Sequence, residues 1–291
     1  MDARLWRQNV DDDPHYDPSG IFIAEGGFAS ARVCRIPLGA DGLKEGQGWI
    51  GALAVHPDHQ RKGVGSRLLG AAEKWLREKG VTRISLGGEP GHFFPGIPRE
   101  RADAQAFFAA HGFTASGDLA HDLRGDIRGY QRLRRAERAI AQNRSFHLQR
   151  CGGLQLPALI TFLEQNFPGR WLYETQLRLQ RERSPQDIML LTIGSRVVGF
   201  AHTYHKGSAH LGPSTYWRKL LGPQYGGLGP MGLSKDVRGL GLGLALLSFS
   251  VETLQAAGVQ KMAVDWTTLT DFYGAAGFES WKQYRAWGKS L

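Results

Sequence analysis

Cysteine is scarce in this chain of 291 residues, and its two cysteines, Cys34 and Cys151, stand far apart in the sequence. Two distant cysteines exclude a disulfide framework and a zinc cluster built on cysteine, and they favour a reducing compartment. Long apolar runs are also missing, since no stretch approaches the ~20 residues that span a bilayer. The first 20 residues lack the basic and then apolar pattern of a signal peptide. These absences predict a cytoplasmic protein that does not insert into a membrane.

Acidic residues are outnumbered, because 27 Asp and Glu stand against 36 Lys and Arg, which gives a net charge of +9. A basic balance favours acidic partners, such as nucleic acid or a polyanionic small molecule. Much of the excess lies in residues 124–144, which hold seven arginines. We interpret this stretch as a solvated helix between domains, with a contact to phosphate or nucleic acid as the alternative. Few aromatic residues interleave with these arginines, so a stacking platform for single-stranded nucleic acid has little support.

A long internal repeat divides the sequence. Residues 53–80 align without a gap with residues 231–258, at a constant offset of 178. Further on, residues 103–113 match residues 268–278 at an offset of 165, so the first copy carries 13 additional residues, which fall within 87–101. Equal order, equal spacing and one localised insertion predict two copies of one domain.

The repeat predicts an α/β fold with two domains of similar plan. In each copy an apolar strand leads into a glycine-rich loop, a helix follows, and a second apolar strand comes after the helix. We expect an N-terminal domain at residues 1–130, a basic connector at 131–144 and a C-terminal domain at 145–291. The first copy lacks counterparts of the strand and helices that the second has over residues 146–182, so we expect it to be truncated at its front and degenerate.

The two glycine-rich loops are typical of a phosphate site. Backbone N–H groups at the start of a helix have no partner within the helix, and the helix dipole adds positive potential there. The spacing fits neither the P-loop nor the dinucleotide-binding signature. It fits the pattern Q/R-x-x-G-x-G/A in both copies. The residues concerned are Gln60, Arg61, Lys62, Gly63, Val64 and Gly65 in the first copy, and Arg238, Gly239, Leu240, Gly241, Leu242 and Gly243 in the second.

With these motifs the chain resembles the GNAT (Gcn5-related N-acetyltransferase) superfamily, as a tandem of two such domains. The resemblance implies a mixed, largely antiparallel central sheet flanked by helices in each domain. It also implies that the loops, with the preceding strand residues Val55 and Leu233, bind the co-substrate acetyl-CoA and hold its pyrophosphate. A second signature of the family, a tyrosine four residues before a glycine, is met by Tyr273 and Gly277.

The resemblance further implies which copy catalyses. Tyr273 occupies the position of a general acid that protonates the leaving thiolate, and an unperturbed phenol is protonated at neutral pH. The first copy has Phe108 at the matching position, and phenylalanine cannot donate a proton. We therefore expect catalysis in the second copy, while the first binds CoA or only maintains the fold.

A general base is harder to assign. Asp265 stands at the end of an apolar strand, where it could take the proton of the amine, and a structural or capping role is the alternative. Glu164 and Glu174 lie on the predicted helices in front of that strand. They are weaker candidates, because most glutamates on helices are solvated.

Three histidines and an apolar insertion invite further interpretations. His202, His205 and His210 suggest a metal, yet residues 202 and 205 of one strand point to opposite faces, so no metal is expected. A histidine that lines the acceptor channel is the alternative. The insertion at 91–98 contains Phe93 and Phe94, which must pack somewhere, either to close the domain interface or to help bind substrate.

The function expected from the sequence is that of an acetyl-CoA-dependent N-acetyltransferase, in which a primary amine attacks the thioester directly within a ternary complex. The acceptor is a small molecule or a peptide, and its identity stays open, as does the oligomeric state. A non-catalytic CoA-binding or regulatory tandem protein is the first alternative. A basic nucleic-acid-binding protein is the second, which the absence of a recognisable nucleic-acid motif disfavours.

Overall fold

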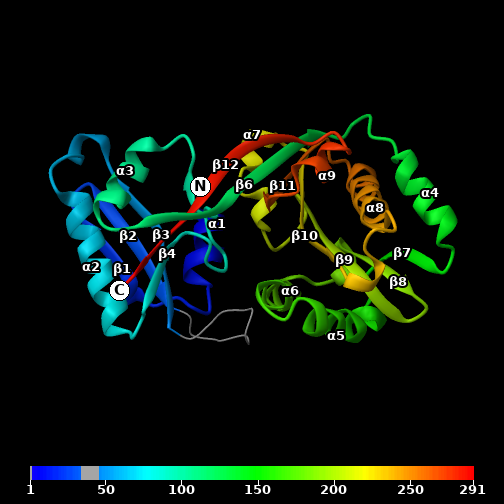
Figure 1. Ribbon diagram of the computed structural model, residues 1–291, viewed down its shortest axis with the longest axis horizontal. Helices are drawn as coiled ribbons and strands as arrows, with labels where there is room; N and C mark the ends of the chain where they lie inside the picture. The colour runs from blue at the N-terminus through cyan, green and yellow to red at the C-terminus, as the bar shows by residue number, and fades with distance from the viewer. Residues whose placement is uncertain (1, 34–45) are drawn as a thin grey trace. The chain divides into compact units, whose positions relative to one another are not determined.

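The computed structural model describes residues 2–33 and 46–291, and its chain divides into two compact units. Unit 1 comprises Met1–Ala120 and Lys282–Leu291, and unit 2 comprises His121–Trp281 (Figure 1). Cys34 lies outside the described residues. Within the part of the chain that is described, no helix has the length and apolar character needed to cross a membrane.

Unit 1 contains an open sheet covered on one face by a long helix. Its elements, in chain order, are α1 (Ala3–Trp6), a π-helical turn (Arg7–Asp11), β1 (Ile21–Ala24), β2 (Gly27–Val33), β3 (Gln47–Val55), α2 (Val64–Glu78), β4 (Arg83–Leu86), β5 (Ile97–Pro98) and α3 (Ala102–Ala110). Strands β1, β2 and β3 are antiparallel, whereas β3 and β4 run parallel on either side of α2. The expected mixed sheet flanked by helices is confirmed in this unit.

Unit 2 repeats this plan and adds elements at its front. Its elements are α4 (Arg134–Gln142), β7 (Phe146–Arg150), α5 (Leu156–Asn166), α6 (Arg170–Arg181), β8 (Ile188–Ile193), β9 (Arg196–His205), α7 (Arg218–Leu221), β10 (Tyr225–Leu233), α8 (Leu242–Ala256), β11 (Lys261–Thr267) and α9 (Thr270–Gly274). Strands β7 to β10 are successively antiparallel, and β10 runs parallel to β11. A hairpin turn at Gly194-Ser195 connects β8 to β9.

The sequence repeat is reproduced in the strand register. Pairing of β3 with β4 runs from Gln47↔Arg83 to Ile50↔Leu86, and pairing of β10 with β11 runs from Tyr225↔Lys261 to Leu228↔Val264. Every one of these residues is matched by its partner in the other copy at the offset of 178 found in the sequence. Both parallel pairs therefore separate at the same point of the fold.

The last strand of each unit comes from the other sequence repeat. Strand β6 (Thr114–Asp126) follows α3 in the chain, yet its residues 121–126 pair with β11 in unit 2. Strand β12 (Glu279–Ser290) follows α9, yet its residues 287–290 pair with β4 in unit 1. The compact units therefore differ from the continuous ranges expected, because two strands are exchanged between the repeats.

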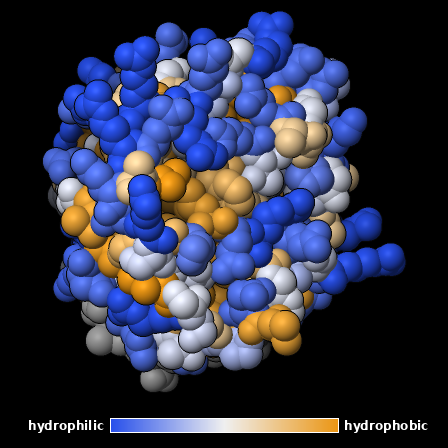
Figure 2. Space-filling view, turned by 90° about the vertical axis from the view of Figure 1, so that its right-hand side faces the viewer, coloured by the Kyte–Doolittle hydropathy of each residue, from blue (hydrophilic) through white to orange (hydrophobic). Residues whose placement is uncertain are grey.

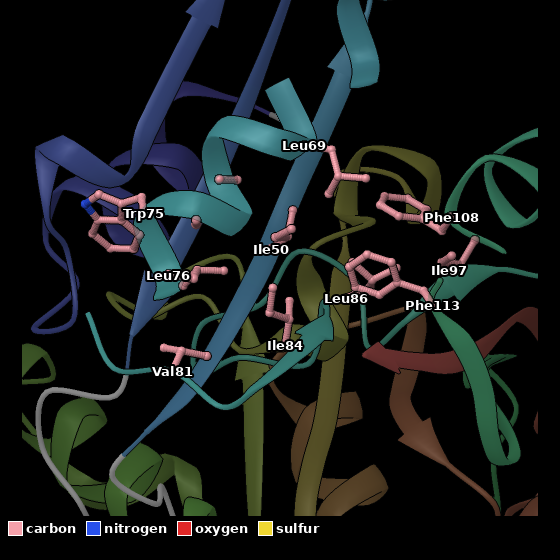
Figure 3. Close-up of a cluster of buried hydrophobic side chains, with 12 residues drawn as sticks. Ile50, Leu69, Trp75, Leu76, Val81, Ile84, Leu86, Ile97, Phe108 and Phe113 are labelled. Atoms are coloured by element: carbon pink, nitrogen blue, oxygen red, sulfur yellow. The ribbon is translucent and has the colours of Figure 1, made fainter. Parts of the chain in front are cut away.

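The core of unit 1 lies between α2 and the sheet, as Figure 3 shows. Leu69, Trp75 and Leu76 project from one face of α2 onto Ile50 and Ile84 of the strands. Their spacing along α2 places them on one helical face, and full burial of a leucine or isoleucine side chain stabilises a fold by about 1.5–3 kcal/mol. The same layer in unit 2 lies between α8 and β10, β11 and β6.

The insertion of the first repeat packs within unit 1. Phe93 is buried and stacks on Trp6, with ring centroids 5.8 Å apart and an interplanar angle of 15°. Ile97 joins the core on α2 and belongs to β5, which pairs with β12. The insertion is thus a structural part of unit 1, and it covers the apolar side chains that its sequence contains.

Candidate functional site

The glycine-rich loop of unit 2 begins the helix α8. Gly241 is the N-cap residue, with φ 76° and ψ −2°, a left-handed conformation that favours glycine. The carbonyl of Gly241 accepts the first helical bonds, from the N–H groups of Leu244 and Ala245 at 3.1 and 3.3 Å. By helix geometry the preceding N–H groups have no partner within the helix, so they form a concentrated positive end. This is the arrangement that a phosphate site requires.

The loop of unit 1 has the same backbone conformation. Gly63 is the N-cap residue of α2, with φ 76° and ψ 0°. In both loops the first residue of the motif bonds the end of the preceding strand. The Gln60 amide donates to the Val55 carbonyl at 2.9 Å, and the Arg238 guanidinium donates to the Leu233 carbonyl at 3.0 and 3.2 Å. The Q/R position of the motif thus closes the loop.

Two parallel strands separate in unit 2, and one of them, β10, leads into the glycine-rich loop. The pairing of β10 with β11 ends at Leu228↔Val264, and the next residues along the two strands are Gly229 and Asp265. A Cβ atom on Gly229 would lie 2.8 Å from Oδ1 of Asp265, so the carboxylate is aimed across the opening between the strands. We refer to this opening, defined by Gly229 and Asp265, as the strand gap.

A bulge in β11 sets the direction of Asp265. In the pairing of β6 with β11, Leu123 pairs with Val264 and His121 pairs with Thr267. Between these two pairs, two residues of β11 therefore face a single residue of β6. Such bulges turn a side chain out of the regular alternation of a strand, and they occur often next to active sites. Sequence periodicity gives no signal for the bulge, which depends on a strand from the other repeat.

Burial and neighbouring charges act together on Asp265. Its Oδ1 is buried without a hydrogen-bond partner among the described residues. Burial raises the pKa of the Asp265 carboxyl well above its usual range, and the negative charges of Asp122 and Glu174 raise it further, against the opposing charge of Arg170. A carboxylate with a raised pKa is a stronger base, which suits proton abstraction near neutral pH.

Substitution of Asp265 by Asn is expected to stabilise the protein at alkaline pH. Because the folded-state pKa is raised, stability is highest below the unfolded pKa and falls as the pH rises through the folded pKa. Asp265→Asn removes this loss, so its melting temperature should exceed that of the wild type at about pH 8 and approach it near about pH 4. Thermal unfolding by circular dichroism at the two pH values measures the difference, and equal gains at both would contradict the assigned shift.

Tyr273 lies on α9 and is 5% exposed within the core that α8 covers. Burial, and secondarily the charge of Asp265, raise the pKa of the Tyr273 phenol, so it stays protonated at physiological pH. The structure thus brings Tyr273 and Asp265 within electrostatic reach of one another. Phe108 takes the same place in unit 1 and has no hydroxyl, so the difference between the copies is retained in three dimensions.

The basic segment between the repeats belongs to unit 2 and is not an exposed linker. Ala136 and Ala139 of α4 are buried against α8, and a Cβ atom on Gly241 would lie 3.0 Å from Cβ of Ala139. Tyr130 and Ser248 share a hydrogen bond of 2.8 Å, which fastens the segment to α8. The exposed arginines of α4 consequently add positive charge beside the loop; they are Arg134, Arg135 and Arg138. Figure 2, which faces the side carrying α4 in Figure 1, shows mostly hydrophilic residues around a hydrophobic centre.

His202 and His205 have separate partners. His202 is fully buried between the Thr175 hydroxyl and the Tyr204 hydroxyl, each at 3.1 Å, and burial lowers its pKa well below its usual range. His205 pairs with Asp187 at 3.1 Å, which raises the pKa of that histidine. Among residues 2–33 and 46–291, no group of His, Cys, Asp and Glu is arranged to hold a metal ion.

The two glutamates proposed from the sequence differ in their surroundings. Glu164 is exposed on α5, where a solvated role is sufficient. Glu174 is largely buried on α6 and accepts a hydrogen bond of 2.7 Å from Nε of Arg170. Arg170 in turn lies 4.5 Å from the ring centroid of Trp266. Glu174 therefore belongs to the charged surroundings of Asp265, and Glu164 does not.

Comparisons with known proteins agree with this fold. The family model described as "Acetyltransferase (GNAT) family" matches residues 4–113 and 156–278, one segment in each repeat. No curated protein sequence matches the chain. A solved structure titled as a GCN5-related glucosamine N-acetyltransferase region of a fungal multi-domain GH3 β-N-acetylglucosaminidase superposes with a TM-score of 0.82 at 30% identity. The match covers 90% of this chain, which spans 31% of the length of the fungal one.

Two further structures share the fold at lower identity. A GCN5-related N-acetyltransferase from Sphaerobacter thermophilus gives a TM-score of 0.63 at 17% identity, over 91% of this chain and 76% of the other. A tandem GNAT protein from the clavulanic acid biosynthesis pathway gives a TM-score of 0.59 at 18% identity, over 91% and 78%. Both matches extend over both units, so the arrangement of two repeats in one chain is shared.

Proposed function

Because the chain belongs to the acetyltransferase (GNAT) family, we propose that it is an acetyl-CoA-dependent N-acetyltransferase that acetylates a primary amine in unit 2. The observation that carries the proposal is the position of Asp265, whose buried Oδ1 lies against Gly229 in the strand gap of β10, the strand that leads into the loop of Gly241. The loop offers N–H groups to the pyrophosphate, and α4 adds positive charge next to it. A polyanionic co-substrate therefore meets an attractive field on this side of unit 2.

The proposed mechanism is a direct transfer within a ternary complex. Asp265 accepts the proton that the amine loses, and the neutral amine attacks the thioester carbonyl. As the C–S bond breaks, the Tyr273 hydroxyl donates its proton to the leaving thiolate, and the phenolate regains a proton from the nitrogen as the amide forms. Cys151 is unsuited to a covalent intermediate, because it is fully buried and burial raises the pKa of its thiol to about 11.

The acceptor proposed for the first assay is glucosamine. The fungal structure that is 30% identical is titled a glucosamine N-acetyltransferase region, and this likeness covers 90% of the present chain. The carboxylates of Asp122, Glu174 and Asp265 lie near one another, since the first two raise the pKa of the third. They favour an acceptor that arrives as a cation, as an amino sugar does.

Unit 1 is proposed to bind CoA without catalysing. Its loop matches that of unit 2 in backbone conformation and in the bond that closes it. Phe108, however, cannot donate a proton to a leaving thiolate. A protein that binds CoA in both units and transfers nothing is the alternative function, which the same loops would also serve.

Release of free CoA thiol in the presence of glucosamine and acetyl-CoA tests the proposal. Direct transfer predicts initial-rate lines that intersect when both substrates are varied, whereas a covalent intermediate predicts parallel lines. Acetylated product must be identified by mass spectrometry, because hydrolysis also releases thiol. Calorimetric binding of acetyl-CoA without transfer to glucosamine or to a broad panel of amines would favour the non-catalytic alternative.

A further inference from the structure

The residue that faces the bulge of β11 is Asp122. It lies on β6, the strand that the first sequence repeat contributes to unit 2, and it is 6% exposed. Its Oδ1 accepts a hydrogen bond of 3.1 Å from the backbone N–H of Trp266, and its Oδ2 accepts one of 3.2 Å from the Trp217 indole. One oxygen of this carboxylate thus accepts a bond from the bulge, and the other accepts one from Trp217, which directly precedes α7.

Trp266 needs such a bond because of its backbone conformation. Its φ is 42°, in the left-handed region that residues with side chains rarely adopt. Such a conformation persists only where the surroundings fix it. The bond to Asp122 fixes the N–H of Trp266, and Trp266 directly follows Asp265. Movement of Trp266 would therefore turn the Asp265 carboxylate away from the strand gap.

We propose that Asp122 is the positioning residue for the general base of unit 2, which holds the bulge of β11 so that Asp265 faces the strand gap. The inference rests on the proposed function, and it adds a residue that neither the loops nor the Tyr273 signature contain. It assigns a catalytic purpose to the strand exchange, because the first repeat supplies a carboxylate to the site of the second.

The charge of Asp122 supports the same role. A nearby negative charge disfavours ionisation of Asp265 and so makes it a stronger base. Other charged groups on the surrounding elements also act on the Asp265 carboxyl. With all of them in place, removal of Asp122 is still expected to lower the pKa of Asp265. The titratable and charged groups that interact with Asp265 are Asp122 on β6, Arg170 and Glu174 on α6, Tyr204 on β9 and Tyr273 on α9.

The variant Asp122→Asn tests the inference through a pH profile. Asparagine has one acceptor oxygen for two donors, so it loses one hydrogen bond together with the charge. We expect kcat to fall about 10-fold with the KM for acetyl-CoA unchanged, since the base is displaced and the loop is not. The acid limb of the kcat/KM profile should move to lower pH. Asp126→Asn is the matched control, because Asp126 lies on the same strand, exposed and paired with Arg128.

A measurement on the free protein separates this inference from the proposed function. Carboxyl carbon NMR of aspartate-labelled protein follows the Asp265 titration, identified by the resonance missing in Asp265→Asn. A lower Asp265 pKa in Asp122→Asn, and not in Asp126→Asn, supports the role of Asp122. An unchanged Asp265 pKa overturns it. If the pKa falls and yet the wild type acetylates no amine, the positioning role stands and the proposed function fails.

Discussion

Tyr273→Phe should lower kcat by about 10² to 10⁴-fold, while acetyl-CoA binds as tightly as in the wild type. The substitution removes only the hydroxyl, so the aromatic contacts with Phe272 and Phe278 are kept. Without the phenol, the thiolate must leave unprotonated or take its proton from water. Steady-state kinetics at saturating acetyl-CoA, with calorimetry of acetyl-CoA binding, separates the chemical step from binding.

The matched control is Tyr130→Phe. Tyr130 packs against the same core in unit 2, but its hydroxyl bonds Ser248 of α8. Its loss is expected to affect stability and to leave kcat within about 3-fold of the wild type. Equal rates for Tyr273→Phe and the wild type would remove Tyr273 from the mechanism and leave proton supply to water or another donor.

Gly241→Glu should weaken acetyl-CoA binding to unit 2 on the order of 100-fold and abolish transfer at ordinary concentrations. A side chain at position 241 is disfavoured in two ways. The φ of 76° is left-handed, and the new Cβ would lie 3.0 Å from Cβ of Ala139. The new carboxylate would also repel the pyrophosphate and oppose the positive end of α8. Calorimetric titration of acetyl-CoA measures the loss directly, and circular dichroism verifies that the variant is folded.

Gly63→Glu is the matched change in unit 1, at a glycine with the same φ of 76°. If unit 1 binds CoA, each wild-type chain binds two equivalents of acetyl-CoA, and each of the two variants binds only one. Transfer is then expected to survive Gly63→Glu and to fail in Gly241→Glu. Loss of transfer in Gly63→Glu alone would reverse the assignment of the catalytic unit.

Local features of the site were predictable from the sequence. The spacing Arg238-x-x-Gly241-x-Gly243 predicted a loop that begins a helix, and the N-cap conformation of Gly241 agrees with it. The apolar residues of α2 recur at the spacing of one helical face, and that face is the buried one. These signals are local, because the residues concerned lie within a few turns of one another in the chain.

The parts that sequence reasoning missed all depend on distant pairings. Asp122 and Trp266 are separated by 144 residues, and no periodicity links them. The continuous domains expected at residues 1–130 and 145–291 gave no sign that β6 and β12 are exchanged between the repeats. The packing of Ala139 against the loop likewise joins segments about 100 residues apart. A single sequence carries no record of such contacts.

The exchange of β12 has a consequence for the order of synthesis. Strand β4 of unit 1 pairs with residues 287–290, and all of unit 2 is translated between the two. When unit 1 leaves the ribosome, the edge of its sheet at β4 is therefore unpaired, and it stays so until β12 has been synthesised. Exposed edges invite pairing with other chains. Slow translation of unit 2 would thus lengthen the interval in which a nascent chain is most prone to aggregate.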